Sequence, residues 1–158
     1  MDISFNGSHL KLIDDRHSSF FGKLPNGVVI KELETPVMVV DDDTFGLMAV
    51  EAILNKLQIQ SFKANNGKDV LEKLEDLYKY GTAVKLILMD CEMPLMDGFE
   101  ATKKLREMMQ YGELPSCPIV GLSGHTETEI EDRVKKSGMD DYVEKPVTEE
   151  KIHEILKQ

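Results

Sequence analysis

The chain has 158 residues, enough for one domain of ordinary size with a short extension. Apolar residues make up 41% and charged residues 30%, so we expect a packed core rather than extensive disorder. Nineteen basic and 29 acidic residues give a net charge of −10. This balance argues against nucleic acid as a partner, because a protein that binds the phosphate backbone needs a basic face.

Three further features predict a cytoplasmic location. No apolar run approaches the roughly 20 residues that a membrane helix needs, so we expect no membrane contact from this segment. The first 15 residues lack a basic stretch followed by an apolar one, so no secretory signal is expected. Cys91 and Cys117 are too few for a disulfide framework or a zinc site. We expect both to be buried thiols in a reducing compartment.

The sequence divides near Pro36. Residues 1–35 show no sustained periodicity, and their short apolar clusters surround Pro25-Asn26-Gly27, which is typical of a turn. This segment is predicted to be an N-terminal extension, either a small hairpin or a linker within a larger protein. Residues 36–158 are predicted to form the folded domain.

Beyond residue 35, short apolar runs alternate with stretches of helical periodicity. The runs are predicted to be strands because they are short, apolar and rich in branched side chains. They cover residues 36–40, 59–64, 86–89, 118–122 and 139–143. Between and after them, apolar residues recur at three- and four-residue spacing, which predicts helices. The helical stripes fall within residues 47–57, 70–78, 97–109, 126–134 and 148–156.

Residues that favour helix ends flank four of these helices. Asn and Thr side chains, and Asp or Thr followed three residues later by Glu, are typical of N-terminal caps. The predicted caps are Asn65 or Asn66, Asp97 with Glu100, Thr126 with Glu129, and Thr148. Gly138 is predicted to end the fourth helix.

Strict alternation of strands and helices predicts an α/β fold with a parallel sheet covered on both faces. Right-handed crossovers and five strands favour the doubly wound, flavodoxin-like arrangement with strand order 2-1-3-4-5. In such sheets, ligands bind outside the carboxyl ends of the strands. Polar residues therefore gather where a ligand is expected: Asp41 to Asp43 after the first strand, Asp90 after the third, Ser123 after the fourth and Lys145 after the fifth.

The chemistry of this group favours phosphoryl transfer beside a divalent cation. Two carboxylates about 5 Å apart repel by roughly 3 kcal/mol at an effective dielectric near 20, so a cation is expected among them. Lys145 can supply part of that charge. A set of oxygen ligands suits Mg²⁺, and a carboxylate beside Mg²⁺ can act as a nucleophile toward phosphorus. Ser123 and Lys145 would then contact phosphoryl oxygens.

Four motifs in this order resemble the receiver domain of two-component response regulators. They are Val39-Val40-Asp41-Asp42, the block MDCEMPLMDG over residues 89–98, VGLSG over residues 120–124, and YVEKP over residues 142–146. The long block is highly specific, whereas a pair of aspartates alone would be a weak signal. The resemblance covers residues 36–157, and its style is most similar to the receivers of hybrid sensor histidine kinases.

The resemblance implies a phosphorelay function and assigns the central residues. Asp90 matches the phosphoacceptor, which takes a phosphoryl group from a histidine kinase or a histidine phosphotransfer protein. Asp41 and Asp42 match the acidic pair that holds Mg²⁺ together with Asp90 and the backbone carbonyl of Glu92. Such a receiver is a signalling module, with only intrinsic self-phosphorylation and dephosphorylation chemistry.

The resemblance also implies how the signal leaves the site. Ser123 matches the hydroxyl that follows the phosphoryl group, and Lys145 matches the lysine that grips it. The Lys145-Pro146 bond is cis in the family, which would aim the lysine inward. Tyr142 matches the aromatic switch residue. The face formed by the fourth helix, the fifth strand and the fifth helix would change with phosphorylation.

The sequence departs from the commonest receiver pattern at several positions. Asp43 stands where Asn is frequent, and Ser123 and Gly124 stand where Thr and Ala are more usual. Glu92 and His125 occupy two positions that tune the lifetime of the phosphoryl group in the family. The sequence therefore leaves that lifetime open.

Two other functions compete with the phosphorelay receiver. A haloacid-dehalogenase-like phosphatase would use a set of residues that this chain also contains, namely Asp41, Asp43, Ser123 and Asp140-Asp141. However, Thr44 sits one position too early for that pattern, and the block around Asp90 would be unexplained. A degenerate receiver acting only as a binding scaffold is the third possibility, although all the acceptor residues are present.

Overall fold

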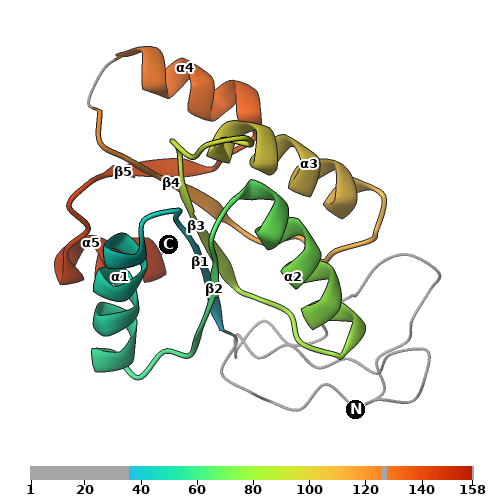
Figure 1. Ribbon diagram of the computed structural model, residues 1–158, viewed down its shortest axis with the longest axis horizontal. Helices are drawn as coiled ribbons and strands as arrows, with labels where there is room; N and C mark the ends of the chain where they lie inside the picture. The colour runs from blue at the N-terminus through green and yellow to red at the C-terminus, as the bar shows by residue number, and fades with distance from the viewer. Residues whose placement is uncertain (1–35, 126–127, 158) are drawn as a thin grey trace.

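The computed structural model describes residues 36–125 and 128–157. Within these ranges the chain forms one five-stranded sheet with the order β2-β1-β3-β4-β5 and helices on both faces (Figure 1). This confirms the predicted doubly wound α/β fold and its strand order. The predicted hairpin or linker over residues 1–35 and the cap at Thr126 lie outside the described residues.

Every strand pairs in parallel with its neighbour. The strands are β1 (Val37–Val40), β2 (Ser61–Ala64), β3 (Leu86–Asp90), β4 (Ile119–Ser123) and β5 (Asp141–Glu144). Asp90 is the last residue of β3 and pairs with Leu122, while Ser123 is the last residue of β4 and pairs with Glu144. The register therefore brings the carboxyl ends of the strands, with their polar residues, to one edge of the sheet.

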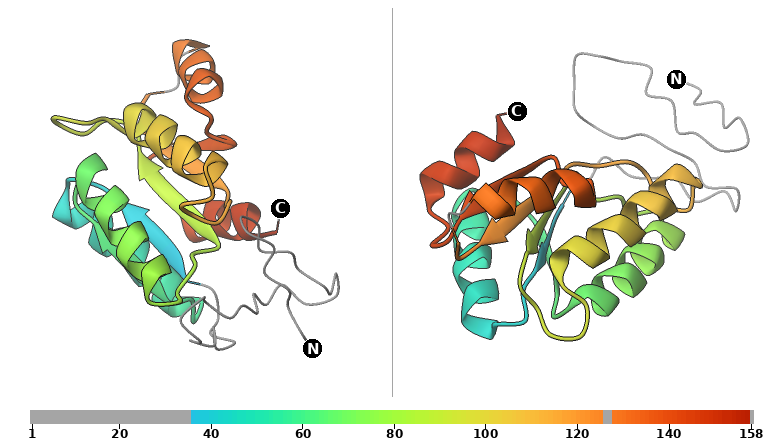
Figure 2. Two further views of the ribbon diagram at one scale, coloured as in Figure 1. Left: turned by 90° about the vertical axis from the view of Figure 1, so that its right-hand side faces the viewer. Right: turned by 90° about the horizontal axis from the view of Figure 1, so that it is seen from above.

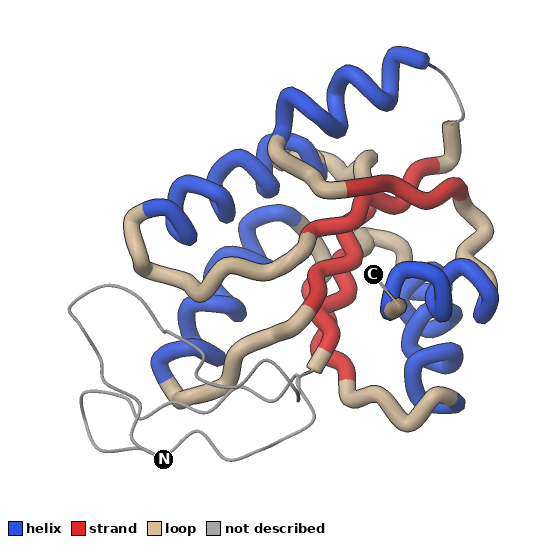
Figure 3. The backbone as a smooth tube through the Cα atoms, turned by 180° about the vertical axis from the view of Figure 1, so that it is seen from behind, coloured by secondary structure: helices blue, strands red, loops and turns tan. Residues whose placement is uncertain are grey.

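The helices divide between the two faces of the sheet, as seen from behind in Figure 3 and from the side and above in Figure 2. They are α1 (Thr44–Lys56), α2 (Gly67–Lys79), α3 (Gly98–Gln110), α4 (Thr128–Ser137) and α5 (Glu149–Leu156). One buried cluster joins α1 and α5 to Val37 and Val39, and the other joins α2, α3 and α4 to Met38 and Val40. Because β1 is covered on both faces, its sequence is a continuous apolar run rather than an alternating one.

Side-chain caps fix where the helices begin. The Asn66, Asp97 and Thr148 side chains accept hydrogen bonds from backbone N–H groups at the starts of α2, α3 and α5, so the choice left open between Asn65 and Asn66 falls on the second. The sequence did not indicate that Asp43 caps α1. Gly138 lies just after α4 at a φ of +88°, a conformation that favours glycine, and this confirms it as the end of that helix.

Several strand boundaries differ from the predictions by one or two residues, and two of these differences have a clear local reason. The predicted start of β2 is two residues early, because the N–H of Ile59 donates to the carbonyl of Leu54 and so completes the end of α1. The predicted start of β5 is likewise early, because the N–H of Met139 donates to Val134 in α4. At its carboxyl end β4 includes Ser123, which pairs with Glu144 of β5.

Among the described helices, none combines the length and the apolar character that crossing a membrane requires.

Candidate phosphoryl-transfer site

Three carboxylates meet at the carboxyl edge of the sheet. One ligand oxygen from each of Asp41, Asp42 and Asp90 lies within 4.8 Å of the others. Asp41 is 2% exposed and Asp90 is 4% exposed, whereas Asp42 faces solvent. The cluster therefore has a buried pair of acids and a third acid at its open side.

Lys145 provides the positive charge in this cluster. Its Nζ lies 3.0 Å from Oδ2 of Asp41 and 3.1 Å from Oδ1 of Asp90. The backbone N–H of Lys145 donates to the carbonyl of Ser123 at 2.7 Å, and its bond to Pro146 is cis, as the family resemblance implied. Burial lowers the pKa of Lys145, but the hydrogen bonds to both carboxylates outweigh that effect and raise it above its usual value. The amine is therefore held in its charged form.

Asp90 is held in an environment that disfavours its charge. Burial raises the pKa of the Asp90 carboxyl to about 6, and the nearby charge of Asp41 acts in the same direction. The hydrogen bond from Lys145 opposes this shift without cancelling it. An additional cation would relieve the remaining repulsion and favour the carboxylate form.

Backbone N–H groups orient both buried carboxylates. The N–H of Asp43 donates to Oδ1 of Asp41 at 2.9 Å, and the N–H of Glu92 donates to Oδ1 of Asp90 at 3.2 Å. Each donor lies two residues beyond its acceptor, at the point where the chain leaves the strand. These bonds hold the carboxylates at the strand ends against their mutual repulsion.

The Ser123 hydroxyl is buried and bonds to its own loop. Its Oγ donates to the carbonyl of His125 at 3.2 Å and accepts from the N–H of the same residue at 3.1 Å. The imidazole of His125 reaches across the site to Glu92, with 2.9 Å between Nδ1 and Oε1, and both of these side chains are largely exposed. The two positions expected to tune the phosphoryl lifetime therefore contact each other.

Tyr142 lies in β5, next to the strand that carries Ser123. Its ring is half-buried and packs against the core cluster shared by α2, α3 and α4. The ring therefore lies at the boundary between the core and the surface.

The structure separates the residues that a phosphatase of the haloacid dehalogenase type would need. The carboxylate of Asp43 accepts from backbone N–H groups at the start of α1 instead of joining Asp41. Asp140 pairs with Arg106 at the opposite end of β5, and Asp141 begins that strand. The acid pair required by that alternative is therefore at the wrong edge of the sheet.

Two glycines allow helices to approach the buried acids, and neither role was predicted from the sequence. A Cβ built on Gly98 would lie 2.1 Å from the backbone oxygen of Asp90, and one built on Gly46 would lie 2.6 Å from Oδ2 of Asp41. Both contacts are shorter than side chains tolerate. In the sequence, the sign of the close approach at Gly98 was a glycine directly after the predicted cap Asp97.

The close approach at Gly98 predicts a sharp cost for a single methyl group. We expect Gly98→Ala to lower the free energy of unfolding by about 2 kcal/mol, because the clash is with backbone that cannot turn aside. Gly124→Ala is the control, since nothing lies within 4 Å of a Cβ at that position. Urea denaturation of both variants checks this; equal stabilities would contradict it.

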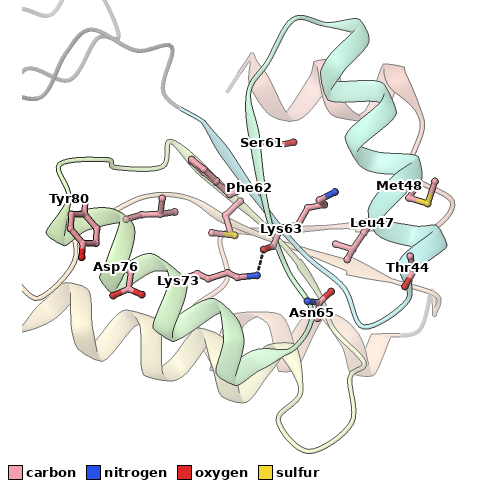
Figure 4. A pocket seen from close by; sticks show the side chains of 12 residues that line it. Thr44, Leu47, Met48, Ser61, Phe62, Lys63, Asn65, Lys73, Asp76 and Tyr80 are labelled. Atoms are coloured by element: carbon pink, nitrogen blue, oxygen red, sulfur yellow. Dashed lines mark hydrogen bonds between the residues drawn. The ribbon is translucent and has the colours of Figure 1, made fainter.

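A separate groove of ≈ 630 Å³ lies away from the acid cluster, along β2 between α1 and α2 (Figure 4). Its wall includes Met48, Phe62 and Tyr80, and the Nζ of Lys73 crosses it to donate to the carbonyl of Lys63. Asp41, Asp90, Ser123 and Lys145 are not among the residues that line it. The acids and Lys145 at the carboxyl edge of the sheet therefore lie outside this groove.

A doubly wound sheet with buried aspartates and a lysine at its carboxyl edge defines a class of phosphoacceptor domain. The family model described as "Response regulator receiver domain" matches residues 37–157. The chain belongs to this family, and it is therefore a receiver domain of two-component phosphorelay signalling.

Individual relatives support this assignment. The chain is 34% identical over 134 residues to the autoinducer 1 sensor kinase/phosphatase LuxN of Vibrio harveyi, covering 85% of this chain but only 14% of LuxN. It is equally similar to two-component response regulator 24 of Arabidopsis thaliana, covering 85% of this chain and 88% of that protein.

A solved structure shows the same fold. The receiver domain of the histidine kinase CKI1 from Arabidopsis thaliana, complexed with Mg²⁺ and BeF₃⁻, superimposes with a TM-score of 0.67. The two sequences are 28% identical over 78% of this chain and 91% of that one.

Proposed function

We propose that Asp90 accepts a phosphoryl group from a phosphohistidine of a partner protein in a Mg²⁺-dependent reaction. The observation that carries this proposal is the position of the Asp90 carboxylate, at the end of β3 with Lys145 Nζ 3.1 Å away and two further acids beside it. In the receiver family, the carboxylate at this position is the nucleophile that attacks phosphorus. Positive charge beside it can offset the negative charge at the site.

The residues of the chain suit an in-line transfer. A carboxylate oxygen of Asp90 would form the new bond to phosphorus while the bond from phosphorus to the histidine nitrogen breaks, and the imidazole leaves. Lys145 would offset the negative charge on the phosphoryl oxygens. Ser123 would give up its bonds to His125 and donate to one of those oxygens.

The acid cluster fits Mg²⁺ because it offers hard oxygen ligands and excess negative charge at one small site. Asp41, Asp42, Asp90 and the backbone carbonyl of Glu92 are the groups that would hold it. When bound, the cation neutralises the repulsion among the acids and the charge on the phosphoryl group. The similar CKI1 receiver, complexed with Mg²⁺, supports this choice of cation.

A protein donor fits the surface around the site. Phe45 at the start of α1 is 80% exposed, and Leu95 in the segment that follows β3 is fully exposed. Exposed apolar side chains beside a reactive group are typical of a surface that another protein covers. We propose a histidine kinase or a histidine phosphotransfer protein as this donor.

The setting of the domain is also part of this proposal. The match to LuxN supports a receiver within a hybrid kinase, with residues 1–35 as the extension or linker that precedes the domain. The cysteines that the structure describes are free and buried, and these thiols support a cytoplasmic location.

The proposed change at the signalling surface of the domain begins with movement of Ser123. Its movement toward the phosphoryl group would shift the segment between β4 and α4, and the half-buried ring of Tyr142 would turn inward as space opens. The face formed by α4, β5 and α5 would then differ between the two states.

Incubation with acetyl phosphate and Mg²⁺, followed by intact-mass measurement and peptide mapping, tests the proposal. We expect one phosphoryl group on the parent chain and none on Asp90→Asn. Modification of Asp41 instead would favour the phosphatase alternative. No modification from acetyl phosphate or from a phosphorylated histidine phosphotransfer protein would indicate a degenerate receiver that acts as a scaffold.

A further inference from the structure

Arg133 connects the two segments that flank the proposed phosphoryl site. It lies on α4, which follows Ser123, and its contacts lie at the start of α3, which follows Asp90. One guanidinium nitrogen is 3.2 Å from Oδ2 of Asp97, and the guanidinium carbon is 4.0 Å from the centre of the Phe99 ring. Arg133 therefore makes an ion pair and a cation–π contact with the same turn of α3.

Both contacts of Arg133 are fixed in place. Asp97 accepts from the N–H of Glu100 as the N-cap of α3, and Phe99 is buried in the core. The side chain of Arg133 is itself about half exposed. The contacts of Arg133 with Asp97 and Phe99 therefore favour the arrangement of α4 on α3 seen here.

The orientation of Ser123 shows why such movement matters. Its hydroxyl bonds to the backbone of His125, within the segment that leads from β4 to α4. To donate to a phosphoryl oxygen on Asp90, the hydroxyl must leave those bonds, and the segment must shift toward β3. Since α4 begins three residues beyond His125, a shift of His125 toward β3 would displace the start of the helix that carries Arg133.

We infer that Arg133 is a positioning residue that holds α4 on α3 in the unphosphorylated arrangement and so opposes capture of the phosphoryl group by Ser123. This inference rests on the proposed function of Asp90. A contact present in one state only biases the equilibrium toward that state, so its removal must favour the other. Loss of the Arg133 contacts therefore strengthens binding of any ligand that needs the shifted arrangement.

Beryllofluoride, a stable stand-in for the phosphoryl group, provides the test. Titration calorimetry of the full chain saturated with Mg²⁺ would compare the parent with Arg133→Gln. We expect Arg133→Gln to bind beryllofluoride about threefold to tenfold more tightly, the size expected for loss of one half-exposed ion pair and one cation–π contact.

The direction of the change in beryllofluoride affinity distinguishes this positioning role from a simple loss of positive charge. Removing a positive charge near an acidic site weakens the binding of an anion, so a charge effect alone would lower the affinity. Lys136→Gln removes the same charge from an exposed position on α4 and is the matched control. We expect Lys136→Gln to leave the affinity unchanged or slightly weaker.

Two further variants localise the effect. Asp97→Asn keeps a good N-cap but loses the ion pair, so we expect it to bind beryllofluoride more tightly than the parent. Arg133→Gln should then increase the affinity less in the Asp97→Asn background than it does in the parent. Arg133→Lys keeps the charge without the planar stacking and should give an intermediate affinity. Unchanged or weaker binding by Arg133→Gln would overturn the inference. Failure of the parent to bind beryllofluoride would instead overturn the proposed function and this inference with it.

Discussion

Replacing Lys145 with methionine should lower the free energy of unfolding by about 3 kcal/mol in the absence of Mg²⁺, a loss of roughly 10 °C in melting temperature. The substitution leaves Asp41 and Asp90 buried side by side with no cation between them. We place the effect at the low end of the range for breaking buried ion pairs, because a third of the Lys145 side chain is exposed.

Mg²⁺ should restore much of the stability that Lys145→Met loses. A cation that binds the folded state stabilises it by mass action, and here it would also replace the missing charge. The Mg²⁺-dependent rise in melting temperature should therefore be larger in Lys145→Met than in the parent chain. Thermal melts with and without Mg²⁺ measure both effects.

Lys63→Met is the matched control for this experiment. Lys63 pairs with Glu51 at 2.9 Å, close to the 3.0 Å of the pair between Lys145 and Asp41, but both partners are partly exposed. Such surface pairs contribute at most about 1 kcal/mol. If Lys145→Met and Lys63→Met lost equal stability, Lys145 would not be neutralising a buried acid pair.

Asp90→Asn should make the metal-free protein more stable at pH 7, by up to about 3 kcal/mol. The pKa of Asp90 is raised from 3.8 to about 6 in the folded chain, so at neutral pH the folded state carries a charge that its environment disfavours. An amide of the same shape removes that charge. Asp132→Asn is the control, because Asp132 is exposed on α4 and lies outside the acid cluster.

The effect of Asp90→Asn should depend on pH in a defined direction. Between pH 3.8 and about 6 the folded state binds more protons at Asp90 than the unfolded state does, so this group makes stability fall as pH rises. Lys145 stays charged in both states over this range, because its pKa is raised. The stability advantage of Asp90→Asn should therefore be near zero at pH 4 and fully developed above pH 6.

Denaturant melts of the parent and Asp90→Asn at half-unit intervals from pH 4 to pH 7.5 measure this difference. The difference between the two proteins is the quantity of interest, since other acids such as Asp69 have a lowered pKa and give the opposite trend in both. A constant difference across this range would show that Asp90 does not titrate abnormally. Addition of Mg²⁺ should reduce the advantage of Asp90→Asn, because the cation stabilises only the parent carboxylate strongly.

Much of the fold could be predicted from the pattern of apolar residues. The runs at Val37–Val40 and Leu86–Met89 contain no polar alternation, and a strand of that kind must be covered on both faces. With helices between the strands, right-handed crossovers leave few arrangements of a five-stranded sheet. The exact strand ends were less accurate, because hydrogen bonds such as that from Ile59 to Leu54 extend a helical turn into residues that look strand-like.

The three consecutive acids after β1 show the limit of sequence reasoning at the site. The sequence places Asp41, Asp42 and Asp43 together, but the structure gives each a different environment. Asp41 is buried beside Lys145, Asp42 faces solvent at the open side of the cluster, and Asp43 caps α1. Their separate environments depend on which way the chain turns as it leaves the strand and on the helix that starts there.

By itself the sequence determined the sheet, its order and the set of residues at its carboxyl edge, because the apolar pattern and the motif spacing are local properties of the chain. Only the tertiary structure decided which charges meet. Lys145 lies 104 residues from Asp41 yet bonds to its carboxylate, and Arg133 reaches Asp97 from another helix. The pKa of Asp90 likewise depends on burial by the packed chain. Distances and desolvation of this kind arise from many long-range contacts at once, and no local pattern encodes them.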